Sequence, residues 1–318
     1  MNGSSDRIKS GSAMRIVQGK RIKKQARRKK LAFYLSIVTL PILQYCIFYI
    51  GVNINSILMA FQSYDAMTGK FYFDGMVNFE RIAREFGKNG QLMTAFLNSV
   101  KYYGITILVM IMSTFFAFYV AKKRPFSGAF RVVAFMPHII SNITMVLLFK
   151  YFTENAYPAI VEAMTGKEVW GLLADPNTVQ ITVIAFCILC GFGTQMMMFS
   201  NAMSAIDVSV SEAALLDGVT PFKEFLYIDL PIIFPTITTF IIVGIAGIFT
   251  NQMSLFSFFG VSADPSVWTL GYYLYKGIKG AAMTEYPYLA ALGVLFTLVV
   301  VPITFTVRRI LNKVDPTA

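Results

Sequence analysis

The stretch SEAALLDGVTPFKEFLYIDLP, Ser211 to Pro231, differs sharply from the sequence on either side of it. From Asp207 to Asp229 the chain carries five acidic residues and a single base, Lys223, for a net charge of −4. Long uncharged apolar runs precede and follow this segment. An acidic segment between two apolar runs suggests a role beyond joining two helices.

The composition indicates a membrane protein. The 318 residues are 56% hydrophobic and 14% charged, with a mean hydropathy of +0.59, whereas soluble domains carry about 25% charged residues. Six uncharged runs are each about long enough for a transmembrane helix, which needs roughly 20 residues. We therefore predict an all-α integral membrane fold with six transmembrane helices, in runs Leu31–Phe61, Tyr102–Ala121, Val132–Phe149, Pro176–Ile206, Leu230–Ala263 and Tyr286–Val307.

The net charge of +11 is concentrated at the N-terminus. Residues 1–30 hold eleven bases and one acid, Asp6, for a net charge of +10. Basic segments next to membrane spans favour the cytoplasmic side, so we interpret this tail as a topology signal and expect no nucleic-acid partner. Both termini are predicted to be cytoplasmic because bases also follow the second and sixth runs, at Lys122, Lys123, Arg124, Arg131, Arg308, Arg309 and Lys313.

The sequence offers little catalytic chemistry. The single histidine, His138, is interpreted as a structural residue at the start of the third span. Its three cysteines lie in apolar runs, so we predict neither a disulfide nor a metal site. There is no G-x-x-x-x-G-K-[ST] loop for ATP phosphates. We therefore expect no catalytic residues and no cofactor on this chain.

The acidic segment carries signals for two short helices. Residues 209–212 form an S-x-x-E capping box, which predicts a helix start. Gly218 fits the left-handed position that closes a helix, and Thr220-Pro221 fits the start of another. Leu230-Pro231 is predicted to end the second helix and to open the next span. The segment is therefore expected to form two helices joined by a glycine elbow.

Helices of about ten residues are marginal in water. The segment must therefore pack against its own protein or dock into a groove on a partner. A capped loop that only connects two spans is also compatible with the pattern.

Glu212-Ala213-Ala214, Asp217-Gly218, Phe225, Ile228 and Leu230-Pro231 resemble the EAA loop, the signature of permease subunits in binding-protein-dependent ABC importers. Residues 135–141, FMPHIIS, are similar to a segment of the complex-sugar branch, as is Val77-Asn78-Phe79. Val219 departs from the alanine that is frequent in the sugar branch. The resemblance extends from about Leu31 to Arg309.

This resemblance implies a type I ABC importer permease fold in a bacterial cell membrane. The expected domains are a basic cytoplasmic tail at 1–30, a six-helix transmembrane domain at 31–309 with a coupling loop at 207–231, and a cytoplasmic tail at 310–318. Such a permease forms half of a path for a sugar or oligosaccharide. The implied partners are a second permease, two ATPase subunits that bind ATP and Mg, an extracellular solute-binding protein and the lipid bilayer. The coupling residues it implies are Glu212, Ala213, Ala214, Asp217, Gly218, Leu230 and Pro231.

Polar and aromatic residues in the later runs are candidates for the solute path, because buried amides need partners or a water-filled cavity. Hydrogen bonds to other helices would also satisfy them. The candidates are Gln195, Asn201, Phe249, Asn251 and Gln252.

Two other functions are open from the sequence. One is a permease of the same class for a solute other than a sugar. The other is a stand-alone secondary transporter, against which the lack of acidic residues within the runs argues.

Overall fold

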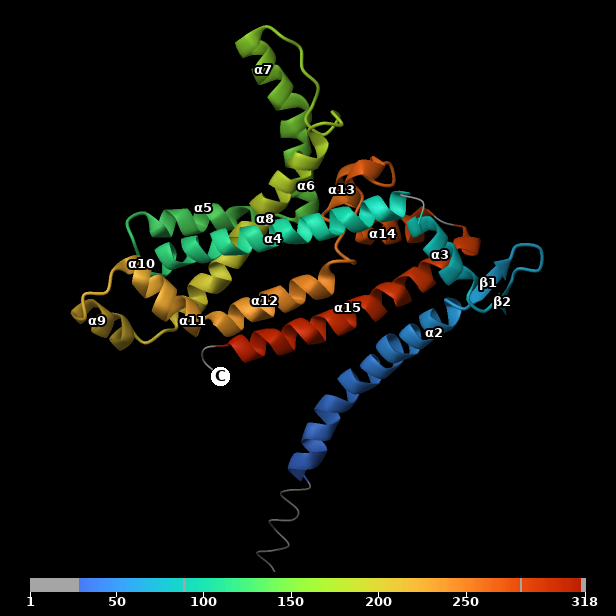
Figure 1. Ribbon diagram of the computed structural model, residues 1–318, viewed down its shortest axis with the longest axis horizontal. Coiled ribbons are helices and arrows are strands. Elements are labelled where there is room, and N and C mark those ends of the chain that lie inside the picture. Colours follow the sequence, from blue (N-terminus) through green and yellow to red (C-terminus); the bar gives the residue numbers. More distant parts are fainter. Residues whose placement is uncertain (1–28, 88–89, 281, 316–318) are drawn as a thin grey trace, which may run out of the picture. The chain divides into compact units, whose positions relative to one another are not determined.

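The computed structural model describes residues 29–87, 90–280 and 282–315, so most of the predicted basic tail and the last three residues lie outside the described part. The chain divides into two compact units, Met1–Leu58 and Met59–Ala318. In the described residues both units are mainly helical (Figure 1).

From Lys29 onward, the part that the structure describes, the first unit is one long helix. Helical backbone runs from Lys29 to Met59 and is apolar enough to cross a membrane. Its second half contains the wider π-helical turn η1, Tyr45–Gly51, and then α2, Val52–Met59. This agrees with the first predicted run.

A short hairpin departs from the predicted all-α fold. Strand β1, Gln62–Asp65, pairs antiparallel with β2, Lys70–Phe73. The Asp65 carboxylate accepts hydrogen bonds from Met67 N (2.8 Å) and Thr68 Oγ1 (2.8 Å), and Gly69 closes the turn with a φ of +67°. The hydrogen bonds of Asp65 and the left-handed backbone of Gly69 therefore favour a turn between two short strands, which lie outside the apolar runs.

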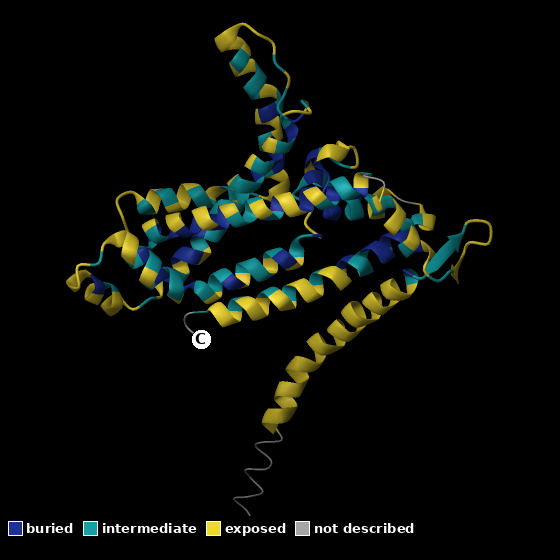
Figure 2. Cartoon of the chain, in the orientation of Figure 1, coloured by how far each residue is buried: buried dark blue, intermediate teal, exposed yellow. Residues whose placement is uncertain are grey.

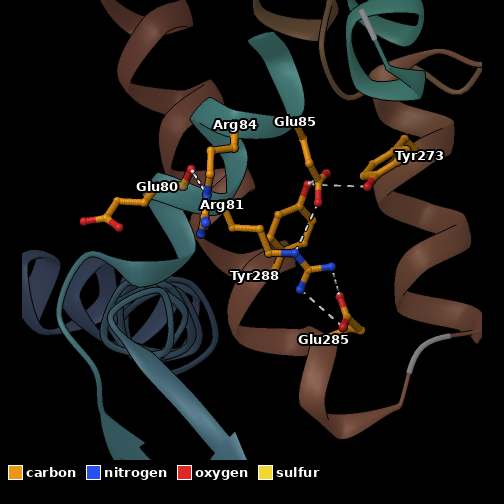
Figure 3. Close-up of polar contacts among 7 residues, drawn as sticks. All are labelled: Glu80, Arg81, Arg84, Glu85, Tyr273, Glu285 and Tyr288. Carbon is orange, nitrogen blue, oxygen red and sulfur yellow. Dashed lines mark hydrogen bonds and ion pairs between the residues drawn. The ribbon is translucent and has the colours of Figure 1, made fainter. Parts of the chain in front are cut away.

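Helix α3, Val77–Gly87, follows the hairpin and is fixed to the last helix. The Arg81 guanidinium pairs with Glu285 (3.0 Å) and Glu85 (3.2 Å) and lies 4.2 Å from the ring centroid of Tyr288. The Tyr288 hydroxyl donates to Glu85 and lies 3.4 Å from the hydroxyl of Tyr273 (Figure 3).

Two long helices pack side by side in the second unit (Figure 1). They are α4, Gln91–Ala121, and α8, Val179–Ser204. Helix α4 starts eleven residues before the predicted run, because Lys101 is accommodated at its surface, where Nζ donates to Gln180 Oε1 (2.7 Å).

The third predicted run is not one straight span, which corrects the sequence interpretation. Helix α5, Ser127–Ile139, ends where Ile140 turns extended, and the next helical stretch, starting with α6, Asn142–Tyr151, is bent by 100° from it. His138 therefore lies in the last turn of α5 and not at the start of a span. Beyond α6 the chain continues through η2, Phe152–Ala156, and α7, Tyr157–Thr165.

The fifth predicted run is also broken. Helix α12 covers only Phe234–Gly247, and the preceding stretch, Pro221–Ile232, is bent by 65° from it. After α12 the chain leaves the helix, with positive φ angles at Met253 (+50°) and Ser254 (+59°). The elements that follow are α13, Leu255–Phe259, η4, Pro265–Val267, α14, Leu270–Gly280, η5, Met283–Glu285, and α15, Tyr286–Val314.

Within the described residues, four helices are long and apolar enough to cross a membrane, and two bent pairs bring the number to as many as six. Large apolar side chains on these helices are widely exposed, including Leu108 (61%) on α4 and Leu298 (72%) on α15 (Figure 2). Such surfaces suit lipid or neighbouring membrane helices.

Candidate functional site

Helix α9, Val208–Leu216, begins the acidic segment. Its N-cap is Asp207, whose carboxylate accepts a hydrogen bond from the backbone N of Ser209 (2.9 Å). The predicted capping box at 209–212 is therefore wrong, because Ser209 already lies inside the helix. The hydrogen bonds from Ser209 to the Asp207 carboxylate lower the pKa of Asp207, which keeps the cap charged.

The end of α9 is a fixed glycine elbow. Gly218 has a φ of +70°, and its N–H donates to Leu215 O (3.1 Å), while Val219 N donates to Ala214 O (3.0 Å). This pair of bonds is the Schellman motif. Thr220 is then extended, and Pro221 starts α10, Pro221–Glu224. The predicted elbow between two short helices is confirmed.

The second helix of the segment extends further than predicted. After α10 the helical backbone continues through η3, Phe225–Asp229, and α11, Leu230–Ile232. The predicted helix end at Leu230-Pro231 is therefore wrong, because Pro231 is the second residue of α11 and follows the π-helical turn η3 without a break. The break instead falls at Ile233.

Four of the seven predicted coupling residues are exposed. Ala214 is buried and Leu230 and Pro231 are half-buried, whereas the others, Glu212, Ala213, Asp217 and Gly218, are exposed. Leu215 and Leu216 next to them are 77% and 88% exposed. The sequence analysis missed these two leucines, although the short length of α9 already limited how many of its side chains a core could cover.

The acidic segment is attached to the C-terminal end of α4 through one lysine, Lys122. Lys122 Nζ lies 2.6 Å from Glu224 Oε1, 2.9 Å from Ser211 Oγ and 3.4 Å from Asp229 Oδ1. The sequence analysis treated Lys122 only as a topology signal. No sequence pattern pairs it with acids about a hundred residues away.

Aromatic packing supports the same attachment. Phe225 is 4% exposed, and its ring centroid lies 4.8 Å from that of Phe115 and 5.3 Å from that of Phe118. Both partners belong to α4, so α4 holds the segment by packing as well as by charge.

Asp229 is an unusual carboxylate, because its side chain is 1% exposed. Burial raises the pKa of Asp229, since the charged form loses water, and the nearby Lys122 ammonium partly opposes this shift. A buried carboxylate without its cation would be strongly destabilising.

A pocket of about 270 Å³ that is lined mostly by apolar side chains lies between α4 and α8, where the chain leaves α12. It brings together two predicted path residues, Gln195 and Asn251, with Thr106, Asn142 and Ser254. A second pocket of about 260 Å³ also contacts Asn251 and Thr106. The Gln195 Oε1 atom is buried without a hydrogen-bond partner among the described residues, which fits a group that binds a ligand or water.

The other three path candidates lie elsewhere. Asn201 is near the end of α8, where its Oδ1 accepts from Arg131 (3.4 Å). Phe249 is 5% exposed and packs between Phe96 and Phe296. Gln252 follows Asn251 but does not line either of the two pockets, and its Oε1 is buried with no hydrogen-bond partner in the part of the chain that the structure describes.

Glycines allow close packing of two pairs of backbones. A Cβ on Gly193 of α8 would overlap the carbonyl oxygen of Ala134 on α5, and a Cβ on Gly271 would overlap the backbone of Thr250. Backbones are therefore in direct contact at these two places.

Comparison with known proteins places these features in a family. Residues 109–316 match the binding-protein-dependent transport system inner membrane component. The arabinooligosaccharides transport system permease AraP of Bacillus subtilis (strain 168) is 24% identical over 285 residues, which cover 87% of each chain. The lactose transport system permease LacF of Rhizobium radiobacter is 26% identical, over 66% of this chain and 73% of LacF. The maltose/maltodextrin permease MalF of Salmonella typhimurium is 25% identical over 56% of this chain, but only 35% of MalF is covered.

The fold is shared with a solved transporter. A chain of a bacterial ABC transporter involved in the import of the acidic polysaccharide alginate superposes with a TM-score of 0.73 at 20% identity, covering 92% of this chain and 99% of that one. The family match spans well over half of the sequence. The chain thus belongs to the family of binding-protein-dependent transport system inner membrane components.

Proposed function

We propose that this chain forms half of the path through which an ATP-driven importer carries a sugar or oligosaccharide, and that the loop from α9 to α10 couples it to an ATPase. Membership of the permease family supports the transport role. The sugar assignment is supported by the names of AraP, LacF and MalF, which are permeases for arabinooligosaccharides, lactose and maltodextrins.

The observation that supports the coupling role is a contrast between two parts of the acidic segment. Phe225 and Asp229 are buried against α4, whereas Leu215 and Leu216, at the end of α9, are almost fully exposed. Two neighbouring exposed leucines at a rigid helix end are typical of a surface that a partner covers. The acidic charge around them favours a partner with basic groups.

The topology follows from the charge distribution. We propose six spans in the domain 31–309, with the segments 1–30, 207–231 and 310–318 on the cytoplasmic side. The bent pairs at α5–α6 and α11–α12 then each count as one span. The positive-inside bias of the N-terminal tail and of the loop after α4 supports this orientation.

The partners follow from the same role. We propose a second permease with its own coupling loop, two ATPase subunits that hold ATP and Mg, and an extracellular solute-binding protein. One solved structure of the alginate transporter contains a periplasmic protein bound to an alginate pentasaccharide. On this chain, Gln195 and Asn251 are proposed to contact the solute, because they line one pocket with hydroxyl and amide groups.

The test is purification of this chain from its native membrane in mild detergent, followed by reconstitution into liposomes with the proteins that accompany it. We expect an ATPase and a second permease to co-purify, and uptake of labelled oligosaccharides to require ATP and the binding protein. A chain that purifies alone and moves solute without ATP would be a secondary transporter, and the proposal would be wrong.

A further inference from the structure

One ammonium group joins three parts of the acidic loop. Lys122 Nζ lies within 3.4 Å of Ser211 in α9, Glu224 in α10 and Asp229 in η3. The three partners are spread over 19 positions of sequence but meet at the C-terminal end of α4. A cation is also favoured there by the helix dipole.

We propose that Lys122 is a positioning residue that links the loop to α4, so that movement of the loop by its partner is passed to α4 and from there to the pockets. This inference rests on the proposed coupling function. It adds a route by which motion of the loop is transmitted through side-chain contacts with α4, in addition to the backbone connections to α8 and α12.

The covalent connections of the loop are poorly suited to transmit motion. Residues 205–207 between α8 and α9 are not helical, and the connection to α12 is bent by 65° at Ile233. Both junctions can change angle while the flanking helices stay in place. The contacts with α4 instead cross between elements without an intervening hinge.

The charges make the link specific. The Glu224 and Asp229 side chains are 15% and 1% exposed, and both carboxylates face the ammonium of Lys122. Without this ammonium, two poorly hydrated carboxylates would face each other and repel. Loss of Lys122 is therefore expected to release the base of the loop from α4, although Phe225 still packs on Phe115 and Phe118.

Helix α4 connects this link to the pockets. Tyr102 and Thr106 line both the 270 Å³ and the 260 Å³ pocket. Thr106 lies 15 residues before Ala121, the last residue of α4, which is about 22 Å at 1.5 Å per residue, and Lys122 follows directly as the C-cap. A tilt of α4 at its Lys122 end therefore displaces the pocket walls.

The experiment uses the assembled transporter in proteoliposomes and measures the amount of solute imported per ATP hydrolysed. Lys122→Met is expected to lower this ratio about fivefold or more, the lower end of typical coupling between sites. ATP hydrolysis itself should continue, and so should co-purification with the ATPase, because the exposed tip of α9 is unchanged.

Three variants separate positioning from a general loss of structure. Lys123→Met removes the neighbouring exposed lysine, whose side chain makes no hydrogen bond or ion pair within residues 29–87, 90–280 and 282–315, and should leave the ratio unchanged. Lys122→Arg should keep most of the wild-type ratio of solute imported per ATP, since the charge is kept. Glu224→Gln should lower the ratio alone, and combined with Lys122→Met it should add little, because both remove the same contact.

The outcomes distinguish this inference from the proposed function. A wild-type complex that shows no ATP-driven import overturns the proposed function and the inference with it. A wild-type complex that couples normally, together with Lys122→Met and Glu224→Gln complexes that import as much solute per ATP, overturns only the inference. If Lys122→Met does not assemble, the same ratio is measured for Glu224→Gln, and an unchanged value there has the same meaning.

Discussion

The ammonium of Lys122 and the carboxylate of Asp229 are 3.4 Å apart, and the Asp229 side chain is 1% exposed. Two opposing effects therefore act on one acid. Burial raises the pKa of Asp229 above its ordinary value of 3.8, and the lysine pulls it back, with burial the larger effect. A folded-state pKa above the unfolded value means that protonation of Asp229 favours the fold.

This predicts an unusual pH response of Asp229→Asn. The stability that Asp229 contributes by binding a proton is present below pH 3.8 and is lost as the pH rises through the raised pKa. At pH 7.5 the variant, which is always neutral at this position, should unfold at the same or a higher temperature than the wild type. Towards pH 4 the two should converge. Thermal unfolding of the detergent-solubilised protein across this range measures the effect.

The matched control is Asp217→Asn, which changes an exposed acid of the same loop. Its unfolding temperature should follow the wild type at every pH. An Asp229→Asn protein that is clearly less stable than the wild type at pH 7.5 would show that attraction to Lys122 outweighs burial.

Gly218→Val should disturb the elbow between α9 and α10. The φ of +70° at Gly218 is unfavourable for a β-branched residue, at a cost of about 1 kcal/mol or more. We expect the loop to become more sensitive to limited proteolysis, and ATP hydrolysis to lose its link to transport. Gly104→Ala is the control, since this glycine is helical with open space around it. Equal proteolysis rates for Gly218→Val and the wild type would contradict the prediction.

The elbow was predictable from sequence because its causes are local. Gly218 and Thr220-Pro221 carry their conformational preferences with them, and the structure follows them. The predicted N-cap, Ser209, lies two residues after the observed one, Asp207. Both residue types are good N-caps, so only the geometry of the preceding turn decides between them.

The breaks in the spans and the attachment of the loop were not predictable in the same way. The predicted runs were bounded by charges, and no charge falls at Ile140-Ser141 or in residues 248–254, so charge gives no sign that helices stop there. The grouping of Gln195 with Asn251, and of Lys122 with Asp229, depends on how α4 and α8 pack. Such contacts are tertiary, and one sequence without aligned relatives does not reveal them.

Gln195→Leu and Asn251→Leu should each weaken solute handling. If each amide makes one hydrogen bond to solute, its loss costs about 1 kcal/mol, or about a fivefold rise in the solute concentration for half-maximal transport. The maximal ATPase rate should change less. Asn201→Leu is the control on α8, because Asn201 bonds to Arg131 and does not line either of these pockets. A larger effect at Asn201 than at Gln195 would place the path elsewhere.

Gly193→Ala should separate α5 from α8. Its added methyl group would overlap the backbone carbonyl of Ala134, which cannot rotate away, so we expect a loss of about 1–3 kcal/mol in the free energy of unfolding. Gly191→Ala is the matched control, since a Cβ there meets no atom within 4 Å. Unfolding temperatures in one detergent compare the two variants directly, and equal values would mean that the helices are not in contact at Gly193.

Arg81→Lys should loosen α3 from α15 although the charge is kept. The Arg81 guanidinium contacts both carboxylate oxygens of Glu285, at 3.3 Å and 3.0 Å, and covers the ring of Tyr288, which a lysine ammonium cannot do at once (Figure 3). The Arg81 and Glu285 side chains are about 40% exposed, so solvent screening limits the expected loss to about 1 kcal/mol or less. Hydrogen exchange of the backbone amides of 77–87 should detect this local opening before global unfolding does. Arg84→Lys is the control, because among the described residues the Arg84 side chain bonds only to the carbonyl oxygen of Glu80 in its own helix. Faster exchange in Arg84→Lys than in Arg81→Lys would show that the contact with α15 does not hold α3 in place.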